Sequence, residues 1–89
     1  MNEKEFLSSI GINFEGNYSG KNSYVVDLDS SNDFSKVFSL LEKSELEEED
    51  ESSMVTLHNT LQVYKNDEFE VTLLGDLDQD EYKLVVKER

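Results

Sequence analysis

The 89-residue chain carries 21 acidic and 8 basic side chains, a net charge of −13, and is long enough for a single domain over residues 1–89. The absence of cysteine excludes disulfides, thiolate metal sites and cysteine nucleophiles, and it fits a reducing cytoplasm. The strong negative charge opposes contact with phosphate backbones and anionic lipids, and it favours encounter with basic partners.

The first predicted element is a short helix near the N-terminus. Asn2 and Glu5 have the spacing of a capping box, and Gly11 is suited to end the helix. The same helical face carries the apolar side chains Phe6, Leu7 and Ile10.

A period of two then predicts a pair of strands. The first begins at Ile12 and alternates through Phe14 and Gly16, and the second covers Tyr24 to Leu28. The segment Asn17–Asn22 between them has turn composition, with Gly20 able to adopt a positive φ, so we expect a hairpin.

The most strongly indicated helix covers residues 32–44. Residues 30–33 offer several N-caps, and apolar residues follow at positions i, i+3, i+4 and i+7: Phe34, Val37, Phe38 and Leu41. This helix is expected to cover a sheet whose core includes Val26, Leu57, Val71 and Leu84. Truncating Phe38 to Ala is then expected to cost about 3–5 kcal/mol of stability.

The remainder of the chain is strand-like. Alternating apolar residues predict strands over Met54–Lys65, Phe69–Leu73 and Tyr82–Val86, joined by polar loops at 65–68 and 75–80. The dipeptide His58-Asn59 permits either a tight turn that divides the first of these strands or a bulge within it. We favour one long, bent strand.

The predicted fold class is α+β. The elements follow in the order α-β-β-α-β-β-β, and strands that are neighbours in sequence usually pair. We therefore expect a small single domain with a mainly antiparallel sheet and the helices on one face.

No motif for catalysis or metal binding is complete. His58 is the only histidine, and no local pattern joins it to a nucleophile, so we expect no enzymatic activity. Asp76, Asp78 and Asp80 open like a calcium loop, but Glu81 replaces the required glycine and Lys87 the closing glutamate. We therefore expect no metal and no other cofactor.

The acidic residues are concentrated in one stretch. The ten residues 42–51 hold seven acidic side chains and one lysine, which is typical of a solvated helix end or loop. Residues of one face of a strand are about 6.6 Å apart, close to the spacing of phosphates on an extended nucleic acid. Carboxylates can therefore imitate phosphates, and the candidate partner-binding residues are Glu45, Glu47, Glu48, Glu49, Asp50, Glu51, Asp76, Asp78 and Asp80.

Charge alone does not give specificity, so an interface of this kind also needs apolar anchors. Tyrosine is enriched at binding hot spots. We expect exposed tyrosines to supply the anchors, with Tyr18, Tyr64 and Tyr82 as the candidates.

The chain resembles the small acidic, cysteine-free inhibitors of the DNA-mimic type that phages use against bacterial restriction and CRISPR systems. The resemblance lies in size, charge and element order, and in the segment 23–27 (Ser-Tyr-Val-Val-Asp) that leads into 30–33 (Ser-Ser-Asn-Asp) and then the acidic run Glu45–Glu51. These families share no common motif, so no residue role is transferred. The resemblance implies stoichiometric blocking of a nucleic-acid groove, without catalysis or cofactor.

Two functions follow as hypotheses. The first is a non-enzymatic inhibitor of a basic nucleic-acid-binding protein, such as a CRISPR or restriction nuclease, that presents carboxylates as phosphate mimics. The alternative is a small acidic adaptor or an immunity or antitoxin-like regulator without mimicry. Both predict a protein partner, no direct binding of nucleic acid or membrane, and a cytoplasmic location, in the host if the chain is phage-encoded. The sequence leaves the oligomeric state open.

Overall fold

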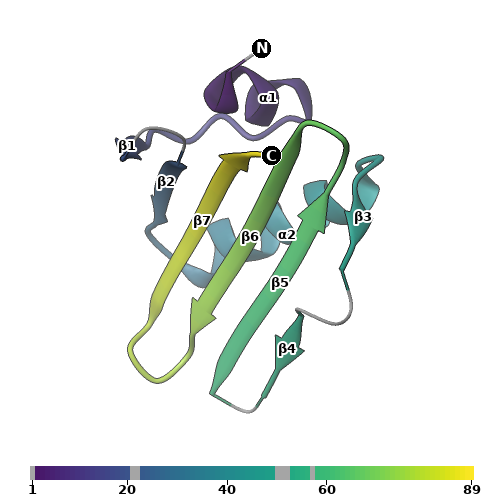
Figure 1. Ribbon diagram of the computed structural model, residues 1–89. Helices are drawn as coiled ribbons and strands as arrows, with labels where there is room; N and C mark the ends of the chain where they lie inside the picture. Colours follow the sequence, from purple (N-terminus) through teal and green to yellow (C-terminus); the bar gives the residue numbers. More distant parts are fainter. Residues whose placement is uncertain (1, 21–22, 50–52, 57) are drawn as a thin grey trace.

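The computed structural model describes residues 2–20, 23–49, 53–56 and 58–89. These residues form an α+β domain with two helices and a seven-stranded antiparallel sheet, which confirms the predicted class (Figure 1). The elements in chain order are α1 (Glu3–Ser9), β1 (Asn17–Ser19), β2 (Ser23–Leu28), α2 (Ser31–Lys43), β3 (Glu47–Glu48), β4 (Met54–Val55), β5 (Asn59–Lys65), β6 (Phe69–Asp76) and β7 (Glu81–Glu88). Neither helix is long and apolar enough to cross a bilayer, among the residues described.

The predicted capping box starts α1. The Asn2 side chain accepts a hydrogen bond from the Glu5 N–H at 2.8 Å, and the Glu5 carboxylate accepts one from the Asn2 N–H at 3.0 Å. Gly11 follows the helix with φ of 93°, a conformation that glycine adopts without strain. The prediction for this helix is confirmed at both ends.

The first predicted strand is displaced. Residues 12–16 form no strand, and β1 lies in the segment that was predicted to be the turn. Ile12 is nevertheless buried in the core. The alternation of apolar and polar residues from Ile12 therefore reflects a loop that packs against the core without pairing to a strand. The hairpin itself is confirmed, because β1 pairs antiparallel with β2 and Gly20 has φ of 75°.

Helix α2 agrees with the prediction within one residue at each end. The Ser30 hydroxyl caps it by accepting from the Asp33 N–H at 3.3 Å. Val37 and Leu41 are fully buried, whereas Phe34 and Phe38 are only partly buried and pack against the edge of the core. The structure therefore places Phe38 against the predicted core as a partly buried residue, so less of its ring is removed from water than at a fully buried site.

The long strand predicted for Met54–Lys65 is also wrong, and the alternative of a tight turn is correct. Strand β4 folds back on β5, with Met54 opposite Leu61. The Thr56 hydroxyl accepts the N–H groups of His58 and Asn59 at 3.3 and 2.9 Å, and this satisfies the backbone within the turn. Leu57 lies outside the described residues.

The last strand, β7, pairs with β2 of the N-terminal hairpin. The strand order is β1-β2-β7-β6-β5-β3, with β4 also paired to β5, so the last strand lies beside the N-terminal hairpin. The chain between β2 and β3 therefore has to pass from one part of the sheet to its opposite edge. Helix α2 makes this crossing behind the sheet (Figure 1).

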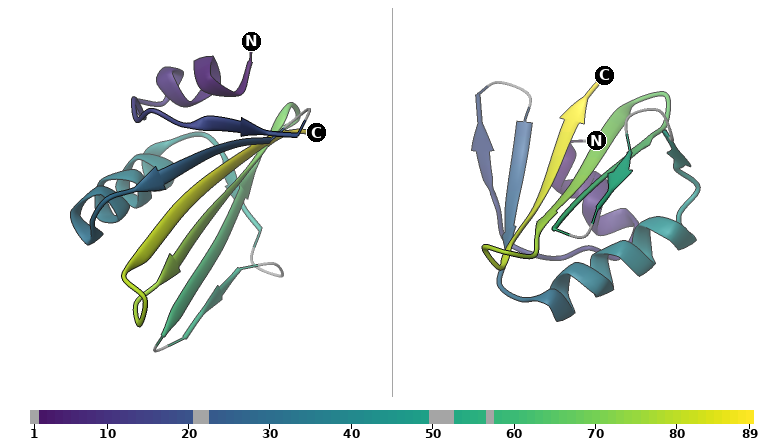
Figure 2. Two further views of the ribbon diagram at one scale, coloured as in Figure 1. Left: turned by 90° about the vertical axis from the view of Figure 1, so that its left-hand side faces the viewer. Right: turned by 90° about the horizontal axis from the view of Figure 1, so that it is seen from below.

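Both helices cover the same face of the sheet (Figure 2). From α1, Phe6 stacks on Phe69 with ring centroids 4.5 Å apart, and from α2, Phe34 contacts Tyr82 at 5.2 Å. The predicted core residues Val26, Val71 and Leu84 are fully buried between sheet and helices. The opposite face of the sheet carries no helix in the part of the chain that the structure describes, and we call it the open face.

Candidate functional site

The candidate carboxylates divide into two groups at opposite ends of β5. Glu47 pairs with Lys65 at one end of this strand, and Asp76 pairs with Asn59 at the other. Asn59 and Lys65 are six residue steps apart along β5, a distance of about 20 Å. We call Glu45, Glu47, Glu48 and Glu49 the β3 cluster, and Asp76, Asp78 and Asp80 the hairpin cluster; Asp50 and Glu51 lie outside the described residues.

Three of the four residues of the β3 cluster have exposed side chains: Glu45, Glu47 and Glu48. Glu49 is held within the protein, because its N–H donates to the Val63 carbonyl at 2.7 Å and its carboxylate lies 3.5 Å from the Lys65 ammonium. The Ser53 hydroxyl continues this attachment by accepting the Val63 N–H at 3.1 Å. The segment is therefore fixed to the edge of the sheet, with its outer carboxylates in solvent.

A buried tyrosine connects this edge to α2. The Tyr64 hydroxyl donates to the Glu42 carboxylate at 3.1 Å. Burial raises the pKa of the Tyr64 phenol well above its ordinary value, and the negative charges of Glu42 and Glu48 raise it further. Tyr64 therefore remains a neutral hydrogen-bond donor.

The hairpin cluster has internal roles. One Asp76 oxygen accepts the N–H groups of Asp78 and Gln79 at 3.1 and 3.2 Å, which closes the turn between β6 and β7. The Asp78 carboxylate lies 2.9 Å from Nδ1 of His58, and the His58 carbonyl accepts the Leu77 N–H at 2.8 Å. These contacts join two neighbouring turns, so His58 lies in an exposed structural contact.

Within the described residues, no three His, Asp or Glu side chains are arranged to hold a metal ion. The Asp76 and Asp78 carboxylates already have partners in the turn, which is what aspartates at such positions commonly do.

The predicted tyrosine anchors are wrong for two of three residues. Tyr64 and Tyr82 are 1% and 5% exposed, because the strand register turns both toward the helices. Tyr18 on β1 is 51% exposed, and its ring rests against Tyr24 with a centroid distance of 5.0 Å. Tyr18 is also distant in the sheet order from β3, so it does not belong to the β3 cluster.

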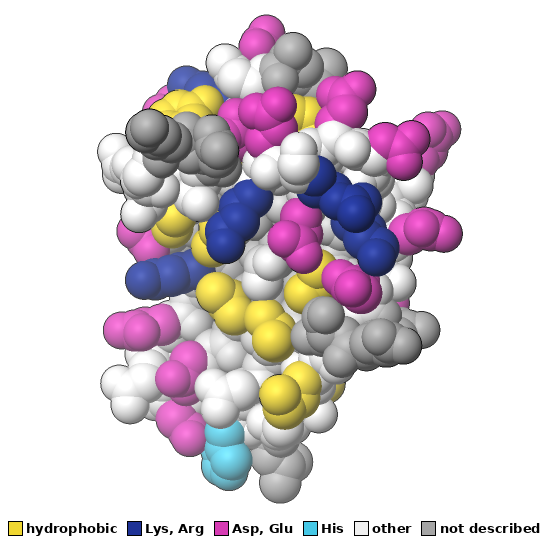
Figure 3. All heavy atoms as spheres, in the orientation of Figure 1, with side chains coloured by type: hydrophobic (Ala, Val, Ile, Leu, Met, Phe, Trp, Pro, Cys, Tyr) yellow, Lys and Arg dark blue, Asp and Glu magenta, His cyan; other side chains and the backbone are white. Residues whose placement is uncertain are grey.

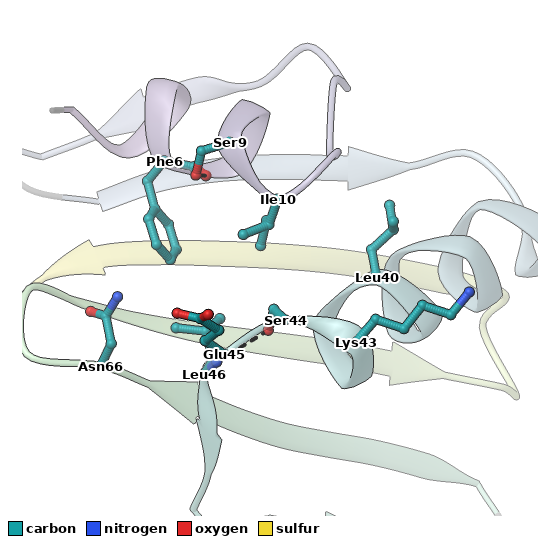
Figure 4. Close-up of a pocket in the computed structure, with 9 residues that line it drawn as sticks. All are labelled: Phe6, Ser9, Ile10, Leu40, Lys43, Ser44, Glu45, Leu46 and Asn66. Atoms are coloured by element: carbon teal, nitrogen blue, oxygen red, sulfur yellow. Dashed lines mark hydrogen bonds between the residues drawn. The ribbon is translucent and has the colours of Figure 1, made fainter.

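A cleft lies beside the β3 cluster (Figure 4). It is open to solvent, has a volume of about 570 Å³, and lies where α1, the end of α2 and the chain entering β3 meet. Its lining residues are Phe6, Ser9, Ile10, Leu40, Lys43, Ser44, Glu45, Leu46 and Asn66. Sequence reasoning missed this cleft; the only signal was that Ile10, Leu40 and Leu46 are apolar residues at the ends of elements.

The open face presents a second surface (Figure 3). The register places half-buried apolar side chains of four adjacent strands in its middle: Val25, Leu61, Leu74 and Val85. Lys65, Lys83 and Lys87 share this face with Glu70, which pairs with both Lys65 and Lys87, and Figure 3 shows acidic side chains between the basic ones beside the apolar area. The surface combines apolar area with the lysines of the last strands.

No protein-family model, curated protein or solved structure matches this chain.

Proposed function

We propose that this protein is a non-enzymatic inhibitor that binds a basic nucleic-acid-handling protein and occupies its nucleic-acid groove. The observation that carries the proposal is the β3 cluster, where three exposed carboxylates lie on a segment fixed to the sheet edge. A fixed row of charges loses little conformational freedom on binding, which favours affinity. A nuclease or nuclease complex of the cytoplasm is the partner class that this surface suits.

The spacing of the charges supports mimicry. Glu47 and Glu48 are adjacent exposed carboxylates on β3, and Glu45 lies in the bend that leads into this strand, so three exposed negative charges fall within four residues. The hairpin cluster lies about 20 Å away along β5, within the length of a groove that tracks several nucleotides. The β3 cluster is the primary contact in this proposal, and the exposed Asp78 and Asp80 extend it.

Competition with nucleic acid tests the proposal. A partner captured from host lysate is purified, loaded with labelled nucleic acid and titrated with the wild-type protein or with a variant carrying Gln at 45, 47, 48, 49 and 51 and Asn at 50. The matched control also removes six negative charges, all at exposed carboxylates elsewhere: Glu15→Gln, Asp27→Asn, Asp29→Asn, Asp67→Asn, Glu81→Gln and Glu88→Gln.

Displacement by the wild type and the control, with much weaker displacement by the neutralised cluster, is the expected result. Equal displacement by all three proteins, or a ternary complex that retains the nucleic acid, contradicts mimicry.

The open face favours a second candidate function, that of an adaptor or immunity-like regulator. Its apolar side chains resemble the centre of a protein interface, and its lysines suit an acidic partner surface. Leu74→Lys, at a half-buried position on this face, should abolish binding in that case and leave it unchanged if the β3 cluster is the contact.

A further inference from the structure

The cleft beside the β3 cluster has an apolar floor. Phe6, Ile10, Leu40 and Leu46 line it, and the last three are partly buried residues that pack against the core. Packing against the core holds these side chains in place, so the floor exists before anything binds. A volume of about 570 Å³ exceeds one side chain and falls in the range of ligand sites.

Two charged side chains line the cleft, the carboxylate of Glu45 and the ammonium of Lys43. Figure 4 shows Glu45 in the cleft beside Leu46, while the Lys43 side chain points away from Glu45 at the end of α2. On the other side, Asn66 leads into the exposed Asp67 and Glu68. The nearby Arg89 guanidinium already donates to the Asn66 carbonyl at 2.7 Å, so it is engaged within the protein.

The carboxyl ends of both helices also converge on the cleft. Ser9 and Ile10 end α1, and Lys43 and Ser44 end α2, and all four residues line the cleft. Each helix end carries partial negative charge, and α1 has no basic residue in its last turn. Helix α2 has Lys43 in its last turn. The cleft therefore combines an apolar floor with the Glu45 carboxylate and the carboxyl end of α1, which no basic residue of its own last turn offsets.

We propose that this cleft receives a segment of the basic partner in which one apolar side chain lies between lysines or arginines. The inference rests on the proposed function and supplies the anchor that the buried tyrosines do not. The apolar side chain covers the floor, and the flanking cations meet Glu45 and the neighbouring carboxylates. Interfaces commonly place a desolvated apolar anchor inside a charged rim in this way.

Synthetic peptides test the cleft without the natural partner. The probe is acetyl-Gly-Arg-Leu-Arg-Gly-amide, titrated against isotope-labelled protein while amide shifts are followed by NMR. We expect the largest shifts at the cleft residues Ser9, Ile10, Lys43 and Leu46. A peptide with Ser in place of Leu should bind about fivefold more weakly, because it covers none of the floor. A peptide with Glu in place of both Arg should not bind.

Two variants with the same charge change locate the site. Glu45→Lys should weaken binding of the Arg-Leu-Arg peptide about tenfold, through a lost attraction and a new repulsion. Asp29→Lys, exposed and at the other end of α2, about 20 Å away, should leave binding unchanged. Lys43→Gln should strengthen binding, because it removes a cation from the rim.

Equal binding of the Leu and Ser peptides, or equal weakening by Glu45→Lys and Asp29→Lys, would overturn the inference and leave only diffuse charge attraction. If Glu45→Lys melts at lower temperature, Ile10→Gln tests the floor instead and should weaken the Leu peptide alone. Failure of the proposed function gives a different result. In that case the cleft binds the peptide, but the protein does not displace nucleic acid from its partner.

Discussion

At the scale of single residues, the hydroxyl groups of two buried tyrosines are expected to affect stability in opposite directions. Tyr24 is 2% exposed, and its hydroxyl has no hydrogen-bond partner among the described residues. Tyr64 is buried equally well, but its hydroxyl donates to Glu42. A buried polar group costs stability when it is unpaired and contributes modestly when it is paired. The same substitution should therefore have opposite signs at these two positions.

Tyr24→Phe should stabilise the protein by about 1 kcal/mol, because it removes a hydroxyl that loses water on folding without gaining a partner. The ring remains in place, so the packing of β2 is kept. Thermal unfolding followed by circular dichroism measures the change. A lower melting temperature would show that the hydroxyl is satisfied in solution.

Tyr64→Phe should destabilise the protein by about 1 kcal/mol near neutral pH, through loss of the hydrogen bond to Glu42. The effect also depends on pH. Because the pKa of Tyr64 is raised in the folded chain, its contribution is fully present below the ordinary tyrosine value of about 10 and is lost as pH rises above it. Urea unfolding between pH 7 and 11 should therefore show a shallower alkaline loss for the variant, and identical profiles would contradict the assignment.

At the scale of elements, α2 stabilises the fold through a narrower stripe than its apolar residues indicate. Val37 and Leu41 are fully buried against the sheet, and Phe34 and Phe38 cover its margin. The sheet has a matching adaptation: a Cβ on Gly75 would lie 3.0 Å from the Phe34 ring, so glycine makes room for the helix.

Leu41→Ala should destabilise the domain by about 2–5 kcal/mol, as a large-to-small change at a fully buried site. Phe38→Ala should cost less, about 1–2 kcal/mol, because this ring is only partly removed from water. Denaturant unfolding of both variants measures which substitution lowers the free energy of unfolding more. A larger loss for Phe38→Ala would mean that the helix is rotated relative to the structure described above.

At the scale of the whole molecule, the net negative charge has opposite effects on folding and on binding. It destabilises the folded state through repulsion between carboxylates, and it favours binding of a basic partner. The described residues have three close pairs of a lysine with a carboxylate, of which two are at the surface and one, Lys65 with Glu49, is half-buried. Most of the 21 acidic side chains therefore repel one another in the folded state. Salt should relieve this repulsion, while it weakens attraction to a basic partner.

Raising NaCl from 0.01 to 0.15 M should increase the melting temperature, because the Debye length falls from about 30 to about 8 Å. Over the same range the affinity for a basic partner should fall. Scanning calorimetry checks the first effect without any partner, with sucrose at equal osmolality as the control. An unchanged or lower melting temperature in salt would show that the carboxylates are not in net repulsion.

The sequence by itself determined the class of fold, the charge and most of the elements. Caps and periodicity are local properties, so Asn2, Ser30 and the apolar spacing of α2 were enough to locate both helices. Hairpin turns with characteristic residues, such as Gly20, were also recognisable. The acidic run Glu42–Glu51 is visible in composition alone.

Only the tertiary structure decided which side chains a partner can reach. The register of β5 turned Tyr64 toward the core and Leu61 to the open face, and a shift of one residue would have exchanged them. The turn at Thr56 divided a strand whose alternation looked continuous. The cleft brings together the end of α1, the segment 40–46 and Asn66, which are remote from one another in sequence, so no local pattern could reveal it. Pairing and packing depend on contacts between distant segments, and these contacts placed the apolar floor of the cleft beside the β3 cluster.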